Sequence, residues 1–265
     1  MPSDTVIGVG AGFRYSVYGP SYDPGPEYWN ETGINMASNF NETIPECIWI
    51  VGIIEENGVC HLSFPVDGTY NLIYGSNTDS NEEVLNLLDE SSYRVWLQVE
   101  PGNASVSDLI NIVMSKYSHH SCITGFGVDV EWLETNTPEG RQVTDNEANL
   151  WVSEIKEHNP DYRLFLKHWE IEKMPPTSRN SIVFIDDSQM FSSLNQMVNE
   201  FEDWGNAFKP SKVGFQFGYS ADKTWWGEFE NPPKRIGNEI LNRIPNAKSL
   251  FWVDFTIFEV FPPSD

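Results

Sequence analysis

The sequence predicts a single (β/α)8 barrel, and three observations lead to that prediction. The chain has 265 residues, close to the roughly 250 typical of this fold. Short apolar segments alternate with amphipathic ones, and an alternation of strands and helices implies a parallel sheet. Several apolar segments also end in polar residues, and in a barrel the carboxyl ends of all strands meet at one face. An open, doubly wound sheet is the alternative, but it would gather its site at a single switch point.

The predicted strands are rich in β-branched and aromatic residues and are bounded by turn-forming residues. They cover residues 5–13, 47–54, 59–65, 93–100, 122–134, 162–169, 181–189, 212–220 and 249–258. The pair Asn57–Gly58 predicts a tight turn, so we expect a β-hairpin insertion near residues 47–65 within one domain that spans residues 1–265. The barrel then has eight strands if this hairpin region supplies the second one.

The predicted helices repeat apolar residues at a spacing of three and four. They cover residues 81–90, 105–118, 144–160, 192–208 and 234–246. The clearest is the one at 144–160, because Thr144 or Asp145 can cap its start and Asn159–Pro160 stops it. Each helix lies between two predicted strands, as a barrel requires.

The charge of the chain excludes some classes of partner. With 39 acidic and 16 basic residues the formal net charge is -23, and nucleic acid or an anionic membrane surface would repel such a protein. No apolar stretch approaches the roughly 18 residues needed to cross a bilayer, so we expect no membrane insertion. We expect a monomer that is secreted or extracellular, although no signal peptide is visible at the start of the sequence.

Three cysteines, Cys47, Cys60 and Cys122, cannot all pair with one another. They lack the C-x-x-C spacing of a zinc ribbon or a thioredoxin-like site. We expect three buried thiols, with one disulfide plus a free thiol as the alternative.

Polar residues stand at the carboxyl ends of six predicted strands. They are Gln98 and Glu100, Asp129 and Glu131, Lys167 and His168, Asp186 and Asp187, Gln216 and Tyr219, and Trp252 and Asp254. Polar ends on six different strands favour the barrel over the open sheet, because only the barrel brings all of them to one mouth.

The segment at 122–134 carries the most informative of these ends. Side chains on a strand alternate between its two faces, so Asp129 and Glu131 are expected to point together into the barrel mouth, with Gly127 leaving room beneath Asp129. Two carboxylates this close cannot both ionise cheaply, so one pKa should rise and that group becomes a candidate general acid. The alternative is that Glu131 only caps the sheet or pairs with an Arg or a Lys. A buried Lys167 could pair with Glu131 or with Asp129, and such a static salt bridge would argue against catalysis.

Residues 124–131 resemble the D-G-x-D-x-D-x-E signature of family 18 glycoside hydrolases, the chitinases and endo-β-N-acetylglucosaminidases. They keep its glycine, its last aspartate and its glutamate, and they have Thr124 and Gly127 at its first two aspartate positions. The resemblance implies that Glu131 protonates the glycosidic oxygen. It also implies that Asp129 orients the substrate's own N-acetyl group, which acts as the nucleophile. Trp252 would then correspond to the tryptophan that forms the floor of the sugar-binding site in that family.

Further residues are candidates for binding sugar. Aromatic rings stack on pyranose faces, and polar side chains at strand ends can bond to hydroxyl groups. The candidates are Trp252, Tyr219, Gln216, Asp187, Glu100, Gln98 and Trp169. The histidines show neither H-x-H nor H-E-x-x-H spacing, so we expect no metal and no cofactor.

The sequence therefore predicts a hydrolase of a β-linked, N-acetylated glycan, and two alternatives stay open. One is a chitinase-like protein that binds carbohydrate without cleaving it. The other is a conventional glycosidase that uses Glu100 and Glu131, with carboxyl groups about 5–5.5 Å apart if it retains configuration and about 6.5–9.5 Å apart if it inverts it.

Overall fold

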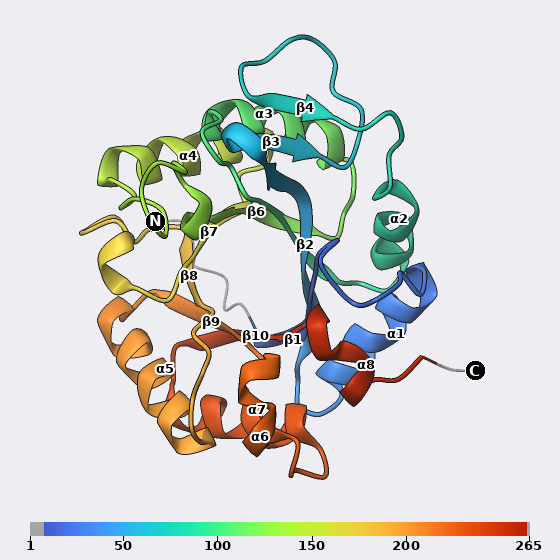
Figure 1. The fold of residues 1–265 in the computed structure, drawn as a ribbon, viewed down its shortest axis with the longest axis vertical. Coiled ribbons are helices and arrows are strands. Elements are labelled where there is room, and N and C mark those ends of the chain that lie inside the picture. The colour runs from blue at the N-terminus through green and yellow to red at the C-terminus, as the bar shows by residue number, and fades with distance from the viewer. Residues whose placement is uncertain (1–7, 264–265) are drawn as a thin grey trace.

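Eight parallel strands form a closed barrel in the computed structural model, which describes residues 8–263 (Figure 1). The first strand of the ring pairs with both the second and the last, which closes the barrel. In order around the ring the strands are β1 (Gly10–Tyr15), β2 (Ile44–Glu55), β5 (Arg94–Val99), β6 (Ile123–Asp129), β7 (Arg163–Lys167), β8 (Ile182–Asp186), β9 (Lys212–Phe217) and β10 (Ala247–Val253). The predicted (β/α)8 barrel is confirmed. Residues 5–7 of the first predicted strand lie outside the described residues.

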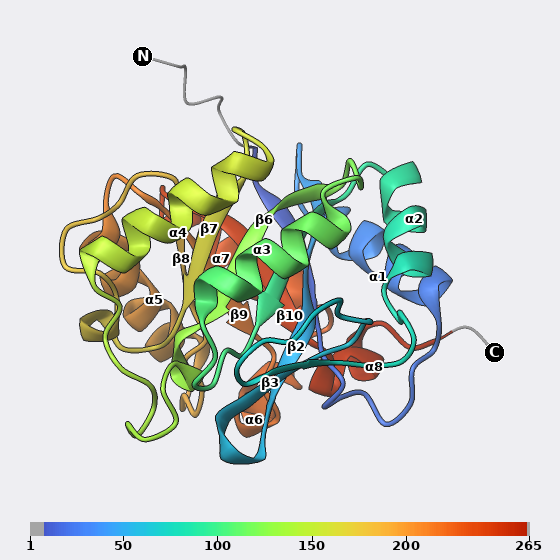
Figure 2. The same cartoon turned by 90° about the horizontal axis from the view of Figure 1, so that it is seen from above.

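Strand β2 continues beyond the barrel into a small extension. Its last four residues pair antiparallel with β3 (Val59–Leu62), and β3 pairs in parallel with β4 (Ile73–Gly75). The tight turn η1 (Glu56–Gly58) connects β2 to β3, and Asn57 and Gly58 both have positive φ there, as such turns require. The hairpin therefore grows from a barrel strand, and its tip projects from the same end of the barrel as α6 (Figure 2).

The helices surround the barrel in the order in which they follow the strands (Figure 1). They are α1 (Pro26–Ala37), α2 (Glu82–Glu90), α3 (Val106–Tyr117), α4 (Asp145–His158), α5 (Leu194–Phe208), α6 (Lys223–Trp226), α7 (Pro232–Arg243) and α8 (Ile257–Val260). The N-cap side chains of Ser105, Thr144 and Ser193 each accept a backbone N–H from the first turn of their helix. Each such cap contributes about 1 kcal/mol. In the described part of the chain, no helix is long and apolar enough to span a bilayer.

Alternate residues of each strand face two separate cores. A small apolar cluster inside the barrel contains Ile48, Ile50, Trp96, Phe165, Val183, Ile185 and Phe251. A much larger cluster lies between the strands and the helices and includes Leu97, Phe126, Val128 and Trp252. The three cysteines are free and buried, as predicted. This inside–outside alternation decides which polar residues reach the barrel mouth.

Candidate active site at the barrel mouth

Four buried polar side chains lie near the carboxyl ends of the barrel strands, beside the interior apolar cluster. Gln98 lies two residues after Trp96 on β5, and Lys167 lies two residues after Phe165 on β7. Asp129 ends β6 opposite Lys167, and Gln216 is opposite the interior residue Phe251. Because side chains alternate along a strand, all four point into the barrel at its carboxyl end.

An ion-pair cluster joins three neighbouring strands at the centre of this mouth. Lys167 Nζ lies 3.0 Å from Asp129 Oδ2 and also bonds to Asp187 Oδ2. Gln98 Nε2 donates to the same Asp129 oxygen at 3.2 Å. All three ion-pair partners are almost fully buried. The alternative that Lys167 pairs with a carboxylate of the signature is therefore realised at Asp129.

Burial and crowding of like charges set the protonation of this cluster. Burial raises the pKa of Asp129 well above its ordinary value, and the charges of Asp187, Glu100 and Glu131 raise it further, against the opposing effect of Lys167. Burial lowers the pKa of Lys167, but the carboxylates of Asp129 and Asp187 more than reverse this, so the ammonium stays charged. One ammonium thus serves two carboxylates.

Glu131 reaches the mouth by a different route from the one predicted. Strand β6 ends at Asp129, and the chain then enters the 3-10 helix η2 (Val130–Trp132). The strand alternation therefore does not extend to Glu131, and the prediction that the two side chains share one strand face is wrong. Glu131 is nevertheless half-buried, and burial raises its pKa, as do the charges of Asp187, Glu100 and Glu139, against Lys167.

The space beneath Asp129 is filled. A Cβ atom at Gly127 would lie 2.0 Å from the ring of Phe165, the interior aromatic residue of β7. The expectation that Gly127 leaves a gap there is therefore wrong. The same contact explains why this position cannot carry the aspartate of the family 18 signature: a larger side chain at 127 and the Phe165 ring would need the same volume.

Glu100 occupies the edge of the mouth. Its Oε2 accepts the phenol of Tyr18 at 2.6 Å and the backbone N–H of Ile54 at 3.0 Å. Tyr18 lies in the segment after β1, so this bond connects the first barrel strand to the hairpin extension. The sequence reasoning missed Tyr18, because nothing in its local pattern distinguishes it from a surface tyrosine.

A second ion pair lies where β1 meets β10. Arg14 donates to Asp254 Oδ1 at 2.6 Å, and the hydroxyl and backbone N–H of Ser16 donate to Asp254 Oδ2. Asp254 was expected at a strand end, but Arg14 and Ser16 were missed. Arg14 could have been recognised as a basic residue that shares the interior face of the first strand with Gly12, two positions earlier.

Tyr219 and Gln216 lie together on the β9 side. The Tyr219 hydroxyl donates to Gln216 Oε1 at 3.3 Å, and both residues are buried. Burial raises the pKa of Tyr219, and Asp187 adds to the effect while Lys167 and Arg14 oppose it. Tyr219 is therefore a neutral hydrogen-bonding group within the influence of the central charges.

Trp252 is not at the mouth, which corrects the sequence prediction. Phe251 faces the barrel interior, so its neighbour Trp252 faces outward and is fully buried among Phe217 and Trp226. Its indole N–H donates to Thr256 Oγ1 at 2.9 Å. No face of this ring is open to a sugar.

Trp169 also lies away from the central cluster. Its ring stacks on His168 with centroids 4.2 Å apart. It lines an open groove of about 320 Å³ together with Asp186, Glu200 and Trp204. Asp186 faces this groove rather than the mouth, and His168 bonds to the Glu139 carbonyl. Trp169 can therefore contact only a ligand that extends beyond the mouth.

Several buried polar atoms around Lys167 have no hydrogen-bond partner among the described residues. They are Gln98 Oε1, Asp129 Oδ1, Asp187 Oδ1 and Gln216 Nε2. Buried polar groups are nearly always satisfied in folded proteins, so water or a polar ligand is the natural partner for these atoms. Within residues 8–263, the side chains spaced to hold a metal ion lie elsewhere, at Glu82, His119 and His120.

No family model matches the chain, and the search of curated proteins found no match. Among solved structures, the chain is similar to one described as the β-D-glucuronidase of Dictyoglomus thermophilum. The likeness has 10% sequence identity and a TM-score of 0.47, and it covers 92% of this chain and 43% of that one. The chain thus spans less than half the length of that protein. A likeness this remote carries no inference about what this chain binds.

Proposed function

We propose that this protein is a glycoside hydrolase that cleaves a β-linked, N-acetylated glycan, with Glu131 as its general acid and base. The observation that carries the proposal is a half-buried Glu131, two residues after Asp129, that is within electrostatic range of an interior cluster of Asp129, Lys167 and Asp187 at the carboxyl ends of three barrel strands. This is the face of a barrel on which catalysis is placed. A raised carboxyl pKa is what a general acid needs near neutral pH.

The proposed chemistry follows from the two carboxyl groups. Glu131 gives its proton to the glycosidic oxygen as the bond from that oxygen to the anomeric carbon breaks. The carbonyl oxygen of the substrate's N-acetyl group bonds to the anomeric carbon, and Asp129 accepts a hydrogen bond from the acetamido N–H. Water then attacks the anomeric carbon as the bond from that carbon to the acetamido oxygen breaks, which regenerates the N-acetyl group. The attacking water gives a proton to Glu131, which restores the starting state.

Polar side chains around these two groups support a sugar as the ligand. Gln98, Asp187 and Gln216 offer unpartnered acceptors and a donor, and Tyr219 and Glu100 border the same charges. Sugars carry hydroxyl groups that both donate and accept. The proposal assigns these residues to substrate binding and gives none of them a bond-breaking role.

Two observations favour other candidate functions. Lys167 holds Asp129 in a buried ion pair, which favours a protein that binds carbohydrate without cleaving it. Glu100 contributes to the raised pKa of Glu131, which favours direct displacement by a Glu100–Glu131 pair.

The test of Glu131 is a hydrolysis screen on chromogenic β-glycosides with and without an N-acetyl group. Glu131→Gln keeps the size of the side chain but cannot exchange the proton, so kcat should fall by about 10²–10⁴-fold with little change in KM. Glu157→Gln, an exposed change on α4, is the control and should match wild type. Full activity in Glu131→Gln would overturn the assignment. Glycan binding by the wild type without turnover would identify the non-catalytic alternative.

The role of the N-acetyl group is tested separately with Asp129→Asn and Glu100→Gln. Substrate assistance predicts that only N-acetylated glycosides are cleaved and that Asp129→Asn suppresses that activity. Cleavage of glycosides that lack the N-acetyl group, abolished by Glu100→Gln, would identify the two-carboxylate mechanism instead.

A further inference from the structure

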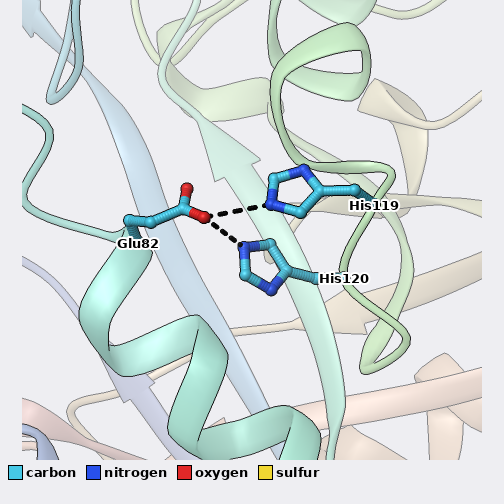
Figure 3. Close-up of side chains that lie close together, drawn as sticks. All are labelled: Glu82, His119 and His120. Atoms are coloured by element: carbon cyan, nitrogen blue, oxygen red, sulfur yellow. Dashed lines mark hydrogen bonds and ion pairs between the residues drawn. The ribbon is translucent and has the colours of Figure 1, made fainter.

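Three potential metal ligands lie close together between α2 and the loop that follows α3, and none of them belongs to the cluster around Lys167 (Figure 3). Glu82 is the first residue of α2, and His119 and His120 lie in the loop between α3 and β6. Glu82 Oε1 is 3.0 Å from His119 Nε2 and 3.4 Å from His120 Nε2. The three ligand atoms all lie within 4.8 Å of one another.

These separations match the edges of a small coordination tetrahedron. Zinc binds imidazole nitrogen and carboxylate oxygen at about 2.0–2.2 Å, so two ligands of a tetrahedral site lie about 3.3 Å apart. The two measured oxygen–nitrogen distances fall on either side of that value. Two edges of the ligand triangle therefore already have the length that a tetrahedral zinc site needs.

The environment of His120 provides a second, independent observation. Its side chain is 1% exposed, and Nδ1 lies 2.8 Å from Asp89 Oδ2. A carboxylate only accepts, so Nδ1 carries a proton, and in the neutral imidazole Nε2 then presents its lone pair. That Nε2 atom is buried, faces Glu82 and has no hydrogen-bond partner among the described residues.

Asp89 is itself fixed in place. Its Oδ1 accepts the backbone N–H of Cys122 at 2.7 Å and the hydroxyl of Ser121 at 3.2 Å. A carboxylate that orients a histidine whose other nitrogen is free is the usual outer shell of a zinc ligand. An ordinary surface ion pair would not require this support.

We propose that Glu82, His119 and His120 bind a divalent transition-metal ion, with zinc as the preferred metal and solvent at the fourth position. Two imidazoles favour zinc, copper or nickel over magnesium or calcium, which prefer oxygen ligands. The side chains of His119 and Glu82 are 55% and 39% exposed, so the ion can enter from solvent. The bound ion ties the start of α2 to the loop that leads into β6.

The test is calorimetric titration of chelator-treated protein with Zn²⁺, Co²⁺ and Mg²⁺. One equivalent of Zn²⁺ should bind to the wild type, Co²⁺ should bind at the same site, and Mg²⁺ should not compete. Glu82→Gln and His119→Ala are surface changes that should fold normally and lower the Zn²⁺ affinity by at least 10-fold. Asp89→Asn removes the charge and replaces one of the two acceptor oxygens with an amide donor, and it should lower the affinity by about 10–100-fold. His158→Ala, in a histidine at the end of α4, is the matched control.

Zinc should also raise the melting temperature of the wild type and of His158→Ala, and it should raise that of Glu82→Gln by less at the same zinc concentration. The proposal is overturned if the wild type takes up no zinc at the protein concentration used. It is equally overturned if Glu82→Gln and His119→Ala bind zinc as tightly as the control, because the cluster would then be a plain ion-pair network.

Discussion

At the scale of single residues, the carboxyl groups near Glu131 should control the pH dependence of catalysis. Burial, Asp187 and Glu100 all raise the pKa of Glu131. A general acid works only while protonated, so activity should fall as the pH rises through this raised pKa. Glu100→Gln removes one negative charge, which makes ionisation of Glu131 easier. The alkaline limb of kcat/KM, which reports the free enzyme, should therefore move to lower pH.

The measurement is a pH profile of kcat/KM for the wild type, Glu100→Gln and the exposed control Glu157→Gln. The glutamine at 100 can still accept a hydrogen bond from Tyr18, so the change mainly alters charge. An alkaline limb that stays in place in Glu100→Gln would contradict the electrostatic coupling between the two residues.

Gly127 is the second residue whose role the packing defines. An added methyl group would lie 2.0 Å from the Phe165 ring, and overpacking of this kind costs about 1–3 kcal/mol. Gly127→Ala should therefore lower the free energy of unfolding by that amount in urea denaturation. The double variant Gly127→Ala with Phe165→Leu should lose less stability than the sum of the two single variants. The smaller leucine leaves space for the added methyl group, so the two effects are not additive. Gly8→Ala, where the nearest atom is 4.0 Å away, should have a small effect. Equal losses at both glycines would refute the packing argument.

At the scale of elements, Lys167 joins β6, β7 and the end of β8 through its two carboxylate partners. Lys167→Met leaves Asp129 and Asp187 buried without a cation, and breaking a buried pair in this way costs about 3–5 kcal/mol. The pKa of Asp129 is already raised in the folded protein. A raised carboxyl pKa means that stability is lost as the pH rises from the unfolded value through the folded one. The deficit of Lys167→Met should therefore be smallest in acid and grow toward neutral pH.

Urea denaturation of Lys167→Met at several pH values measures this deficit, with Lys234→Met on the exposed start of α7 as the control. The double variant Lys167→Met with Asp129→Asn removes one orphaned carboxylate and should regain part of the stability. A deficit that does not depend on pH would mean that lost packing, and not uncompensated charge, explains the effect.

The strands were predictable because a buried parallel strand has a recognisable composition. Eight of the predicted segments contain most or all of a barrel strand, and the polar ends of β5, β6, β7 and β9 do meet at the mouth. Helix α1 was not predicted. Its buried side includes Thr32, and also Gly33, where the Tyr93 ring leaves no room for a side chain, so it lacks a strong apolar stripe.

The site was only partly predictable, because composition shows neither which face of a strand a side chain occupies nor where the strand ends. Phe251 and Trp252 are equally apolar, and only the barrel register shows that the tryptophan faces outward. The change from strand to 3-10 helix after Asp129 has no local signal either. The cluster of Glu82 and His119 joins residues 37 positions apart, which no short motif describes.

At the scale of the whole molecule, ion pairs stabilise the closure of the barrel, while the overall charge works against the folded state. Arg14 and Asp254 pair at 2.6 Å where β1 meets β10. Burial raises the pKa of Asp254, although Arg14 and the bonds from Ser16 oppose the rise. Such buried pairs are screened little by salt. The formal net charge of -23 acts over the whole surface, where salt screens it strongly.

This contrast predicts that the melting temperature rises with ionic strength. Added salt weakens the mutual repulsion of the surface carboxylates, while the Arg14–Asp254 and Lys167 pairs keep most of their strength. Scanning calorimetry in NaCl from about 0.01 M, where the screening length is roughly 30 Å, to about 0.15 M, where it is roughly 8 Å, measures the rise. Chelator in every sample keeps metal binding constant. Replacing the exposed Glu27, Glu31 and Glu228 with Gln reduces the magnitude of the net charge, from -23 to -20. The rise in melting temperature with salt should then be smaller. A melting temperature that falls with salt would show that surface ion pairs outweigh the repulsion.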